Sequence, residues 1–238
     1  MPDGIYAAAA GMQAQQTRID LLSNDISNMD TTGYQSQRVA FSDLVYSAEQ
    51  GVPVGSGSSV STLGPTSGQG EVQTSDDPMS LAITGPGYFQ VKQGNGSPAL
   101  TRDGSFQLDA DGNIVTSTGE KLDPPIQVPK GTQASDISVG KDGSVTVANK
   151  VIGKIGVVDV PSQMGLDPIG NNLFAITAAS GQPKAASSTI EQGALESSNV
   201  DLAQTMSDMI DAQRSYELAS RAIKTQDELL DDADSLVK

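Results

Sequence analysis

The 238-residue chain contains no cysteine, no histidine and no tryptophan, and aromatic residues make up only 4% of it. These absences exclude zinc sites built from cysteine or histidine, thiol nucleophiles, Ser-His-Asp triads, haem held by histidine, and disulfides. An enzyme with this sequence would depend on carboxylate, lysine, serine or tyrosine chemistry, and no spacing of the acidic residues singles out a catalytic pair. We therefore expect a protein that is not an enzyme and that holds no cofactor or metal.

Basic residues are also scarce, since 14 lysines and arginines stand against 29 acidic residues and leave a formal net charge of −15. Non-specific binding to nucleic acid needs clustered positive charge, so we expect no nucleic-acid partner. No apolar run approaches the roughly 18 residues of a membrane span. The N-terminal segment has no basic region and carries Asp3, which is unlike a cleavable signal peptide.

The N-terminal segment, from Asp3 to about Met29, has the pattern of an amphipathic helix. Apolar or small residues recur at alternating intervals of three and four, which is typical of a helix that packs one stripe against a partner. The stripe consists of Ile5, Ala8, Met12, Gln15, Ile19, Leu22, Ile26 and Met29, and only Gln15 interrupts it. Gly33 can adopt a left-handed conformation, so we expect the helix to end near residues 28–33.

The C-terminal segment predicts a second, longer amphipathic helix. Ser197, Ser198 and Asn199 are good capping residues, and Asp201 follows Ser198 by three positions. This helix has two sets of positions that would face a partner. The set that begins with Met206 predicts weaker packing, because most of its residues are polar. The apolar positions that recur every seven residues are Leu202, Met209, Tyr216, Ile223, Leu230 and Val237.

This C-terminal helix would be ~55 Å long at 1.5 Å per residue, so its stripe needs a partner. One candidate is the N-terminal helix, which has an equally regular stripe. The other is the same helix in another subunit. Packing of the two helices within one monomer is the simpler alternative, but a pair of helices leaves much of its seam exposed. The sequence therefore favours self-association through both ends of the chain.

The middle of the chain predicts β-structure. Residues 51–70 are rich in glycine and serine and indicate an extended, weakly structured connector. From about Glu71, short β-prone runs alternate with Asn-Gly or Asp-Gly dipeptides, which are strong hairpin signals. The segment from Asp109 to Glu120, which contains one of these dipeptides, superficially resembles a calcium loop. It has Ile114 where that loop needs glycine, so a hairpin turn is favoured.

Together these patterns predict an α+β protein. We expect the long N- and C-terminal helices to pair as a coiled coil beside a central, mainly antiparallel β domain. Residues 1–34 and 196–238 would form a discontinuous helical domain. Residues 35–70 would form the extended connector, and residues 71–195 the β domain.

Several segments resemble the bacterial flagellar basal-body rod and hook protein family. Residues 23–34, SNDISNMDTTGY, are similar to the family's N-terminal signature, and residues 195–202, LESSNVDL, to its C-terminal one. Residues 81–89, LAITGPGYF, and 101–106, TRDGSF, also resemble family segments. The motif positions that carry this resemblance include Asn24, Asn28, Gly33, Asn199, Gln213 and Arg214.

This resemblance implies a structural subunit of the flagellar rod, located in the basal body outside the cytoplasmic membrane and in the periplasm where an outer membrane is present. It implies export by the flagellar type III apparatus, helical polymerisation through the terminal helices, and contact with neighbouring rod and hook proteins, so that torque passes from motor to hook. Residues 14–20 and 41–44 look most like distal-rod members. A hook or proximal-rod paralogue stays open, as does a secreted β-domain enzyme or glycan-binding module.

The resemblance and the residue pattern point to the same surface. We expect the assembly interface to consist of the apolar stripes of both helices, namely Ile5, Met12, Ile19, Leu22, Ile26, Leu202, Met209, Tyr216, Ile223, Leu230 and Val237.

Overall fold

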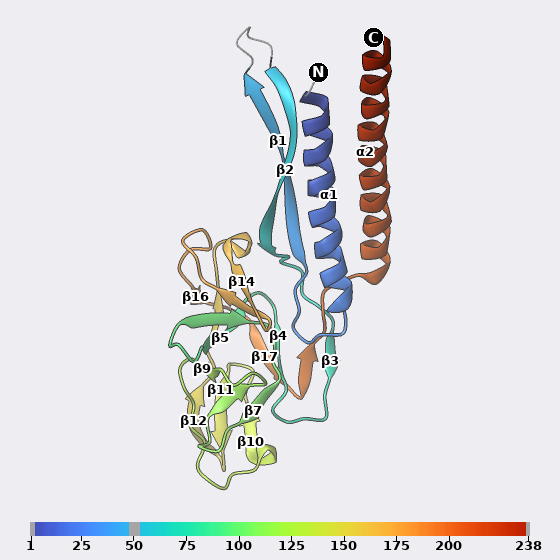
Figure 1. Cartoon of the computed structure of the whole chain (residues 1–238). Helices are drawn as coiled ribbons and strands as arrows, with labels where there is room; N and C mark the ends of the chain where they lie inside the picture. The colour runs from blue at the N-terminus through green and yellow to red at the C-terminus, as the bar shows by residue number, and fades with distance from the viewer. Residues whose placement is uncertain (1–2, 48–52, 237–238) are drawn as a thin grey trace. The chain divides into compact units, whose positions relative to one another are not determined.

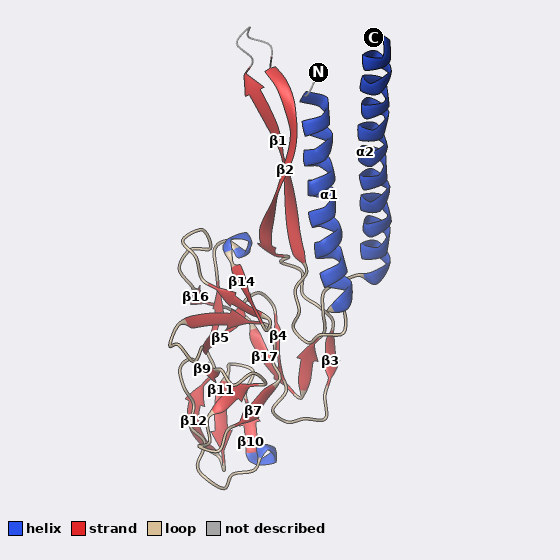
Figure 2. Ribbon diagram, viewed as in Figure 1, coloured by secondary structure: helices blue, strands red, loops and turns tan. Residues whose placement is uncertain are grey.

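The computed structural model describes residues 3–47 and 53–236. Two long helices lie near the two ends of the chain, with β-strands between them (Figure 1, Figure 2). The described residues form two compact units. The helical unit contains residues 3–27, 37–47, 53–63 and 201–236, and the β unit contains residues 28–36 and 64–200.

The helical unit contains both helices and one small sheet. Helix α1 (Asp3–Ser27) and helix α2 (Leu202–Leu236) pack on each other and run in opposite directions (Figure 1). Strands β1 (Gln37–Ser47) and β2 (Pro53–Pro65) form a two-stranded sheet, and β1 packs on α1. Both predicted helices are therefore present, and their presence beside an antiparallel β unit confirms the α+β class.

The segment expected to be an extended connector contains β1 and β2, so its extended backbone is paired rather than isolated. Small residues in this segment allow close packing. Gly57 in β2 has a φ of +103°, and a Cβ added to it would lie 2.8 Å from the Cβ of Ala10 on α1. Glycine that suggests flexibility in the sequence thus lets a strand approach a helix here. The domain boundaries inferred from the sequence stay a prediction.

The β unit is built from antiparallel strand pairs. Nine strands form the largest sheet, in the order β14-β15-β6-β5-β9-β8-β7, with β13 paired to β5 and β16 to β13. A three-stranded sheet has the order β10-β11-β12, and two pairs, β17-β4 and β18-β3, complete the unit.

The first strands of the β unit are β3 (Val72–Thr74), β4 (Leu81–Thr84), β5 (Tyr88–Lys92), β6 (Pro98–Thr101), β7 (Phe106–Leu108), β8 (Ile114–Thr116) and β9 (Lys121–Leu122). The later strands are β10 (Ile137–Val139), β11 (Ser144–Val147), β12 (Lys150–Lys154), β13 (Val157–Asp159), β14 (Asp167–Gly170), β15 (Leu173–Ala175), β16 (Lys184–Ala185), β17 (Thr189–Gln192) and β18 (Ala194–Glu196). The short 3-10 helices η1 and η2 cover Ala134–Asp136 and Gln163–Gly165.

The hydrophobic core of the β unit explains why these short strands are stable. Phe89 and Phe106 lie edge to face at its centre, with ring centroids 5.1 Å apart. Aliphatic side chains of the surrounding strands, such as Leu81, Ile83 and Ile114, are almost fully buried around them. Burial of apolar area contributes about 25 cal/mol per Å², so this core stabilises the unit.

Most of the hairpins predicted from glycine dipeptides are present. Gly96, Gly112 and Gly143 all have positive φ, and each lies between two antiparallel strands. The Asp103-Gly104 dipeptide does not form a hairpin, because β6 and β7 are not paired to each other. Gly104 instead accepts a hydrogen bond from the main-chain N–H of Leu81, at 3.0 Å, in a position too close for any side chain.

Candidate assembly surface

The predicted interface residues on α1 are half-buried within the helical unit. Met12, Ile19, Leu22 and Ile26 all have this intermediate exposure, as expected for a stripe with part of its surface covered. The most buried of the described residues of the same helix is Ala14, which is not part of the predicted stripe. Ile5 belongs to α1, but its side chain is outside the described set.

The predicted residues on α2 divide into covered and exposed positions. Met209 and Ile223 are half-buried, whereas Leu202 and Tyr216 are exposed. The side chain of Leu230 is not among those described, and Val237 lies outside the described residues. Two described positions of the seven-residue repeat are therefore partly covered, and the other two are exposed.

The second set of positions inferred to face a partner on α2, which begins with Met206, is not the set that the structure buries. Met206 and Gln213 are exposed, whereas Thr205 and Ala212 are buried and Ala219 is half-buried. The covered face is therefore shifted by one residue toward small side chains. Apolarity alone favoured Met206, but a small residue such as Ala212 allows α1 to approach more closely, and this close approach decides which side faces inward.

Polar groups also lie between the two helices. Arg18 of α1 donates to Oδ1 of Asp208 on α2 at 3.1 Å, and both side chains are about one-third exposed. Gln15, the one polar residue in the predicted stripe, has a buried Oε1 atom with no hydrogen-bond donor among the described residues. A buried, unpaired amide oxygen costs free energy, so Gln15 weakens the packing of α1 and stands out among the stripe residues.

A large apolar surface of α2 stays exposed. This surface includes Leu202, Met206, Ile210, Tyr216, Leu218 and Leu229. Single exposed apolar residues are ordinary on a protein surface, but a series along one helix is a candidate interaction site. The seven-residue repeat in the sequence includes only part of this series, because Ile210, Leu218 and Leu229 lie outside its single register.

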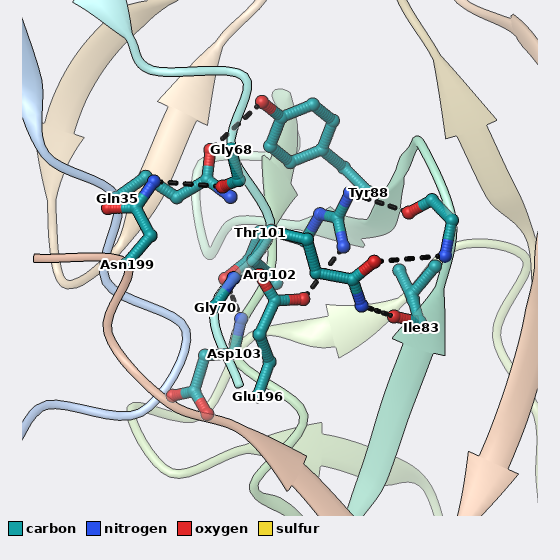
Figure 3. A network of polar contacts seen from close by, with 12 residues as sticks. Gln35, Gly68, Gly70, Ile83, Tyr88, Thr101, Arg102, Asp103, Glu196 and Asn199 are labelled. Atoms are coloured by element: carbon teal, nitrogen blue, oxygen red, sulfur yellow. Dashed lines mark hydrogen bonds and ion pairs between the residues drawn. The ribbon is translucent and has the colours of Figure 1, made fainter. Parts of the chain in front are cut away.

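The resemblance to the rod and hook family also singled out positions in the chain segments that lead into and out of the β unit. Residues 33–36, 66–70 and 196–199 all lie in that unit, and we call their meeting point the junction (Figure 3). The main-chain N–H of Gly33 donates to the carbonyl oxygen of Glu196 at 2.8 Å. Gly33 has a φ of +66°, and an added Cβ would overlap the backbone of Asp103.

Asn199 ties the same three segments together. Its Oδ1 accepts a hydrogen bond from the main-chain N–H of Ser36 at 2.8 Å. Its Nδ2 donates to the carbonyl oxygen of Gly68 at 2.9 Å, a bond drawn in Figure 3. The main-chain N–H of Asn199 also donates to the carbonyl oxygen of Tyr34 at 3.3 Å. Asn199 therefore does not cap α2, contrary to the sequence-based interpretation.

The capping residue of α2 is Asp201. Its Oδ1 accepts hydrogen bonds from the main-chain N–H groups of Ala203 and Gln204, at 2.9 and 3.1 Å. Aspartate is among the strongest N-cap residues because its carboxylate pairs with the unsatisfied N–H groups of the first turn. The residue type of Asp201 is itself an N-cap signal in the sequence, but Ser197 and Ser198 just before it are also good N-cap residues.

A buried ion pair lies at the centre of the junction. Nη1 of Arg102 donates to Oε2 of Glu196 at 2.7 Å, and the exposed fractions of the two side chains are 4% and 1%. The other carboxylate oxygen of Glu196 accepts from the main-chain N–H of Gly70 at 3.1 Å, and Nη2 of Arg102 donates to the carbonyl oxygen of Gly85 at 2.9 Å (Figure 3). Arg102 lies in residues 101–106, which resemble a family segment, but no pattern in the sequence indicated a role for it.

Tyr88 extends this arrangement. The guanidinium carbon of Arg102 lies 5.4 Å from the centre of its ring, which is a cation–π distance. The Tyr88 hydroxyl donates to Oε1 of Gln35 at 3.3 Å. Burial raises the pKa of Tyr88 to about 12, although the positive charge of Arg102 acts in the opposite direction. The phenol therefore stays protonated and serves as a hydrogen-bond donor.

The remaining motif positions lie elsewhere. Gln213 and Arg214 are exposed on α2, and Asn24 is exposed near the end of α1. Asn28 accepts a hydrogen bond from the main-chain N–H of Thr31 at 3.1 Å, which starts the turn after α1. The motif therefore combines residues of the junction with residues of the helix surface.

The loop that superficially resembles a calcium site is a turn. Oδ1 of Asp109 accepts hydrogen bonds from the main-chain N–H groups of Asp111 and Asn113, at 2.8 and 2.7 Å. The side-chain amide of Asn113 donates as well, and these hydrogen bonds hold the pKa of Asp109 below its usual value. Among the described residues, no acidic cluster is arranged to bind a metal ion. The described helices also include none that is long and apolar enough to cross a membrane.

Comparison with known protein families gives three matches in order along the chain. The model described as "Flagella basal body rod protein" matches residues 5–35. The "Flagellar hook protein FlgE/F/G D1 domain" matches residues 82–147, and the "Flagellar basal body rod FlgEFG protein C-terminal" matches residues 191–236. These ranges cover α1, much of the β unit and α2.

Curated relatives match over almost the whole chain. The flagellar basal-body rod protein FlgG of Agrobacterium fabrum is 36% identical over 249 residues, covering 93% of this chain and 94% of the relative. FlgG of Borreliella burgdorferi is 36% identical over 262 residues, covering 99% of each. FlgG of Caulobacter vibrioides is 35% identical over 253 residues, covering 95% of this chain and 96% of the relative.

Proposed function

Because the chain belongs to the FlgG family of flagellar basal-body rod proteins, a structural family rather than an enzymatic one, we propose that it polymerises helically with copies of itself and transmits torque from motor to hook. It is a structural subunit of the basal-body rod. In the proposed polymer, the terminal helices pair as a coiled coil within each subunit and supply the contacts between subunits.

The observation that carries this proposal is the exposed apolar surface of α2. α1 covers one side of α2, where Thr205 and Ala212 are buried, yet Leu218 and Leu229 on the same helix are 65% and 64% exposed. Burial of such side chains contributes about 1.5–3 kcal/mol each. A filament in which neighbouring subunits cover them would gain this free energy, and repeated non-closing contacts generate a helical polymer.

The assembly residues inferred from the sequence take two roles in this proposal. Met12, Ile19, Leu22, Ile26, Met209 and Ile223, which are half-buried, would hold α1 against α2 within a subunit. Leu202 and Tyr216, which are exposed, would contact neighbouring subunits. Ile5, Leu230 and Val237 are assigned to the interface from the sequence pattern alone.

Further partners follow from membership of the family. Rod and hook proteins are axial proteins of one continuous structure, so we expect this chain to adjoin other axial proteins at the two ends of its own segment. We also propose that it leaves the cell through the flagellar type III apparatus and, where an outer membrane is present, assembles in the periplasm.

Electron microscopy of the purified full-length chain tests the proposal of self-assembly. At increasing protein concentration we expect tubular polymers with a helical repeat. The double variant Leu218→Asp/Leu229→Asp should not polymerise, because it places charge on the exposed surface of α2. Val151→Asp, at a residue of β12 that is 61% exposed, is the control and should polymerise normally. Absence of polymers from the unmodified chain at every concentration would contradict the proposal.

Gold labelling of purified basal bodies tests the location. An antibody against the β unit should label the rod between the motor and the hook. Label on the hook itself would instead favour the hook paralogue.

A further inference from the structure

Methionine is the only residue type through which this chain can be oxidised at sulfur, since the sequence contains seven methionines and no cysteine. Hydrogen peroxide transfers one oxygen atom to the thioether, which becomes a sulfoxide while the peroxide is reduced to water. The side chain changes from apolar to polar, and its new oxygen needs a hydrogen-bond donor where it is buried. The effect of oxidation therefore depends on what each methionine packs against.

The described methionines differ in exposure. Three are exposed, namely Met29, Met164 and Met206. Met12 on α1 and Met209 on α2 are half-buried. Met79 lies in the hydrophobic core of the β unit and is 4% exposed. Peroxide should oxidise the exposed methionines fastest and Met79 slowest, so Met12 and Met209 are the two that are both reachable and packed.

Met209 lies on the covered side of α2. It follows Thr205 by four residues and precedes Ala212 by three, and both of these neighbours are buried. Because α2 packs on α1, α1 is what covers this side. Met206 lies three residues before Met209 but on the exposed surface of the same helix. Two methionines within one turn of α2 thus differ in whether they pack on α1.

Met12 is the corresponding packed methionine of the first helix. It precedes Ile19 by seven residues, and Ile19 is also half-buried, so the two residues share one side of α1. The elements that pack on α1 include α2 and β1, and both belong to the helical unit. The thioether of Met12 is therefore packed inside the helical unit.

We propose that sulfoxidation of Met12 and Met209 by peroxide loosens the packing of α1 on α2 and leaves the β unit intact. A sulfoxide oxygen at this contact needs a donor, but Arg18, which lies between the helices, already donates to Asp208. Oε1 of Gln15 is itself a buried acceptor without a donor among the described residues. Burial of a further unpaired acceptor costs free energy. The inference concerns packing within one subunit and does not depend on the proposed self-assembly.

Two matched double variants test the proposal. Met12→Leu/Met209→Leu removes the half-buried sulfurs, and leucine replaces methionine in packed positions with little disturbance. Met164→Leu/Met206→Leu is the control, because it removes two sulfurs whose side chains are each 52% exposed. Each full-length protein is treated with hydrogen peroxide, and mass spectrometry of its peptides measures the sulfoxide fraction at every methionine.

Thermal unfolding at the helix band of circular dichroism then gives the effect of oxidation. We expect the unmodified chain and the control variant to lose roughly 4–8 °C in melting temperature, the shift that a modest loss of packing free energy produces in a unit of this size. Met12→Leu/Met209→Leu should keep its melting temperature after the same treatment. In the oxidised unmodified chain, hydrogen exchange should become faster in α1 and α2 and stay unchanged in β5 and β6.

Three results would overturn the proposal. The first is an equal loss of melting temperature in Met12→Leu/Met209→Leu and in the control variant. The second is an unmodified chain that carries sulfoxide at Met12 and Met209 and melts as before. The third is a chain in which neither of these methionines is oxidised under conditions that oxidise Met164. Recovery of the lost stability after treatment with methionine sulfoxide reductase would support the proposal.

Discussion

Arg102 and Glu196, which are far apart in the sequence, form a buried ion pair with an N–O distance of 2.7 Å. The same two residues hold three chain segments, because Glu196 binds Gly33 and Gly70 while Arg102 binds Gly85. Two of these segments lead directly to the helical unit. The ion pair and its hydrogen bonds therefore hold together chain segments of the β unit that are distant in sequence.

Removal of one partner of this pair should be strongly destabilising. Arg102→Met leaves the Glu196 carboxylate buried without its counter-charge, and we expect a loss of about 3–5 kcal/mol in the free energy of unfolding. Urea unfolding followed by circular dichroism measures it. The double variant Arg102→Met/Glu196→Leu should lose less, because no charge is left buried.

Arg221→Ala is the matched control for that experiment. Arg221 lies 3.9 Å from Glu217 on the exposed surface of α2, and a surface pair of this kind contributes about 0–1 kcal/mol. An equal loss for Arg102→Met and Arg221→Ala would show that the buried pair has no special role.

Tyr88 should make the β unit sensitive to alkaline pH. Its pKa is raised from 10.0 to about 12 in the folded protein by burial, so unfolded chains lose this proton at a lower pH than folded ones. The contribution of the neutral phenol is complete below pH 10 and is lost as the pH rises toward 12, by about 2–3 kcal/mol in total. Tyr88→Phe should reduce this alkaline loss of stability in urea unfolding, whereas Tyr216→Phe, on the surface of α2, should not.

Gln15 should limit the stability of the helical unit. Its buried Oε1 has no donor among the described residues, so Gln15→Leu removes an unsatisfied polar atom and should stabilise the packing of α1 by about 1–3 kcal/mol. Thermal unfolding followed at the helix band of circular dichroism measures this gain. Gln16→Leu is the control, because Gln16 is exposed and bonds Asp20 within its own helix, and no gain is expected there. A lower melting temperature for Gln15→Leu would show that the amide is required in the folded chain.

Gly33 should not tolerate a side chain. Gly33→Ala places a Cβ against the backbone of Asp103 at a φ of +66°, and we expect a loss of more than about 1 kcal/mol in urea unfolding. Gly94→Ala is the control, because no atom lies within 4 Å of the added Cβ and the backbone there is not left-handed. Similar unfolding curves for the two variants would contradict the close approach at Gly33.

The sequence predicted the elements better than it predicted the contacts between them. Periodicity located both helices, and the Asn-Gly and Asp-Gly dipeptides located three hairpins, because these signals arise within a few residues. The covered face of α2 was displaced by one residue, since Ala212 is inward for reasons of shape and Met206 is outward although it is more apolar. Local patterns do not record how closely a distant helix approaches.

The junction illustrates the same limit. Arg102, Glu196 and Tyr88 carry no periodic or compositional signal, and their roles depend on segments that meet only after folding. Asn199 was recognised as important through the resemblance to the rod and hook family. The sequence suggested a helix cap, whereas in the structure its side chain binds Ser36 and Gly68, in the two other chain segments of the junction. A buried polar cluster assembled from distant segments becomes visible only in three dimensions.

The main-chain hydrogen bond between Gly33 and Glu196 has a consequence for how such chains diversify. Glu196 also accepts a hydrogen bond from Gly70, so residues 71–195, which contain neither β1 and β2 nor the helices, leave and re-enter the junction at one place and can grow or shrink without changing these points of entry and exit. An unrelated module with neighbouring ends could be grafted at the same place, and the proposed polymer would then display it along its length.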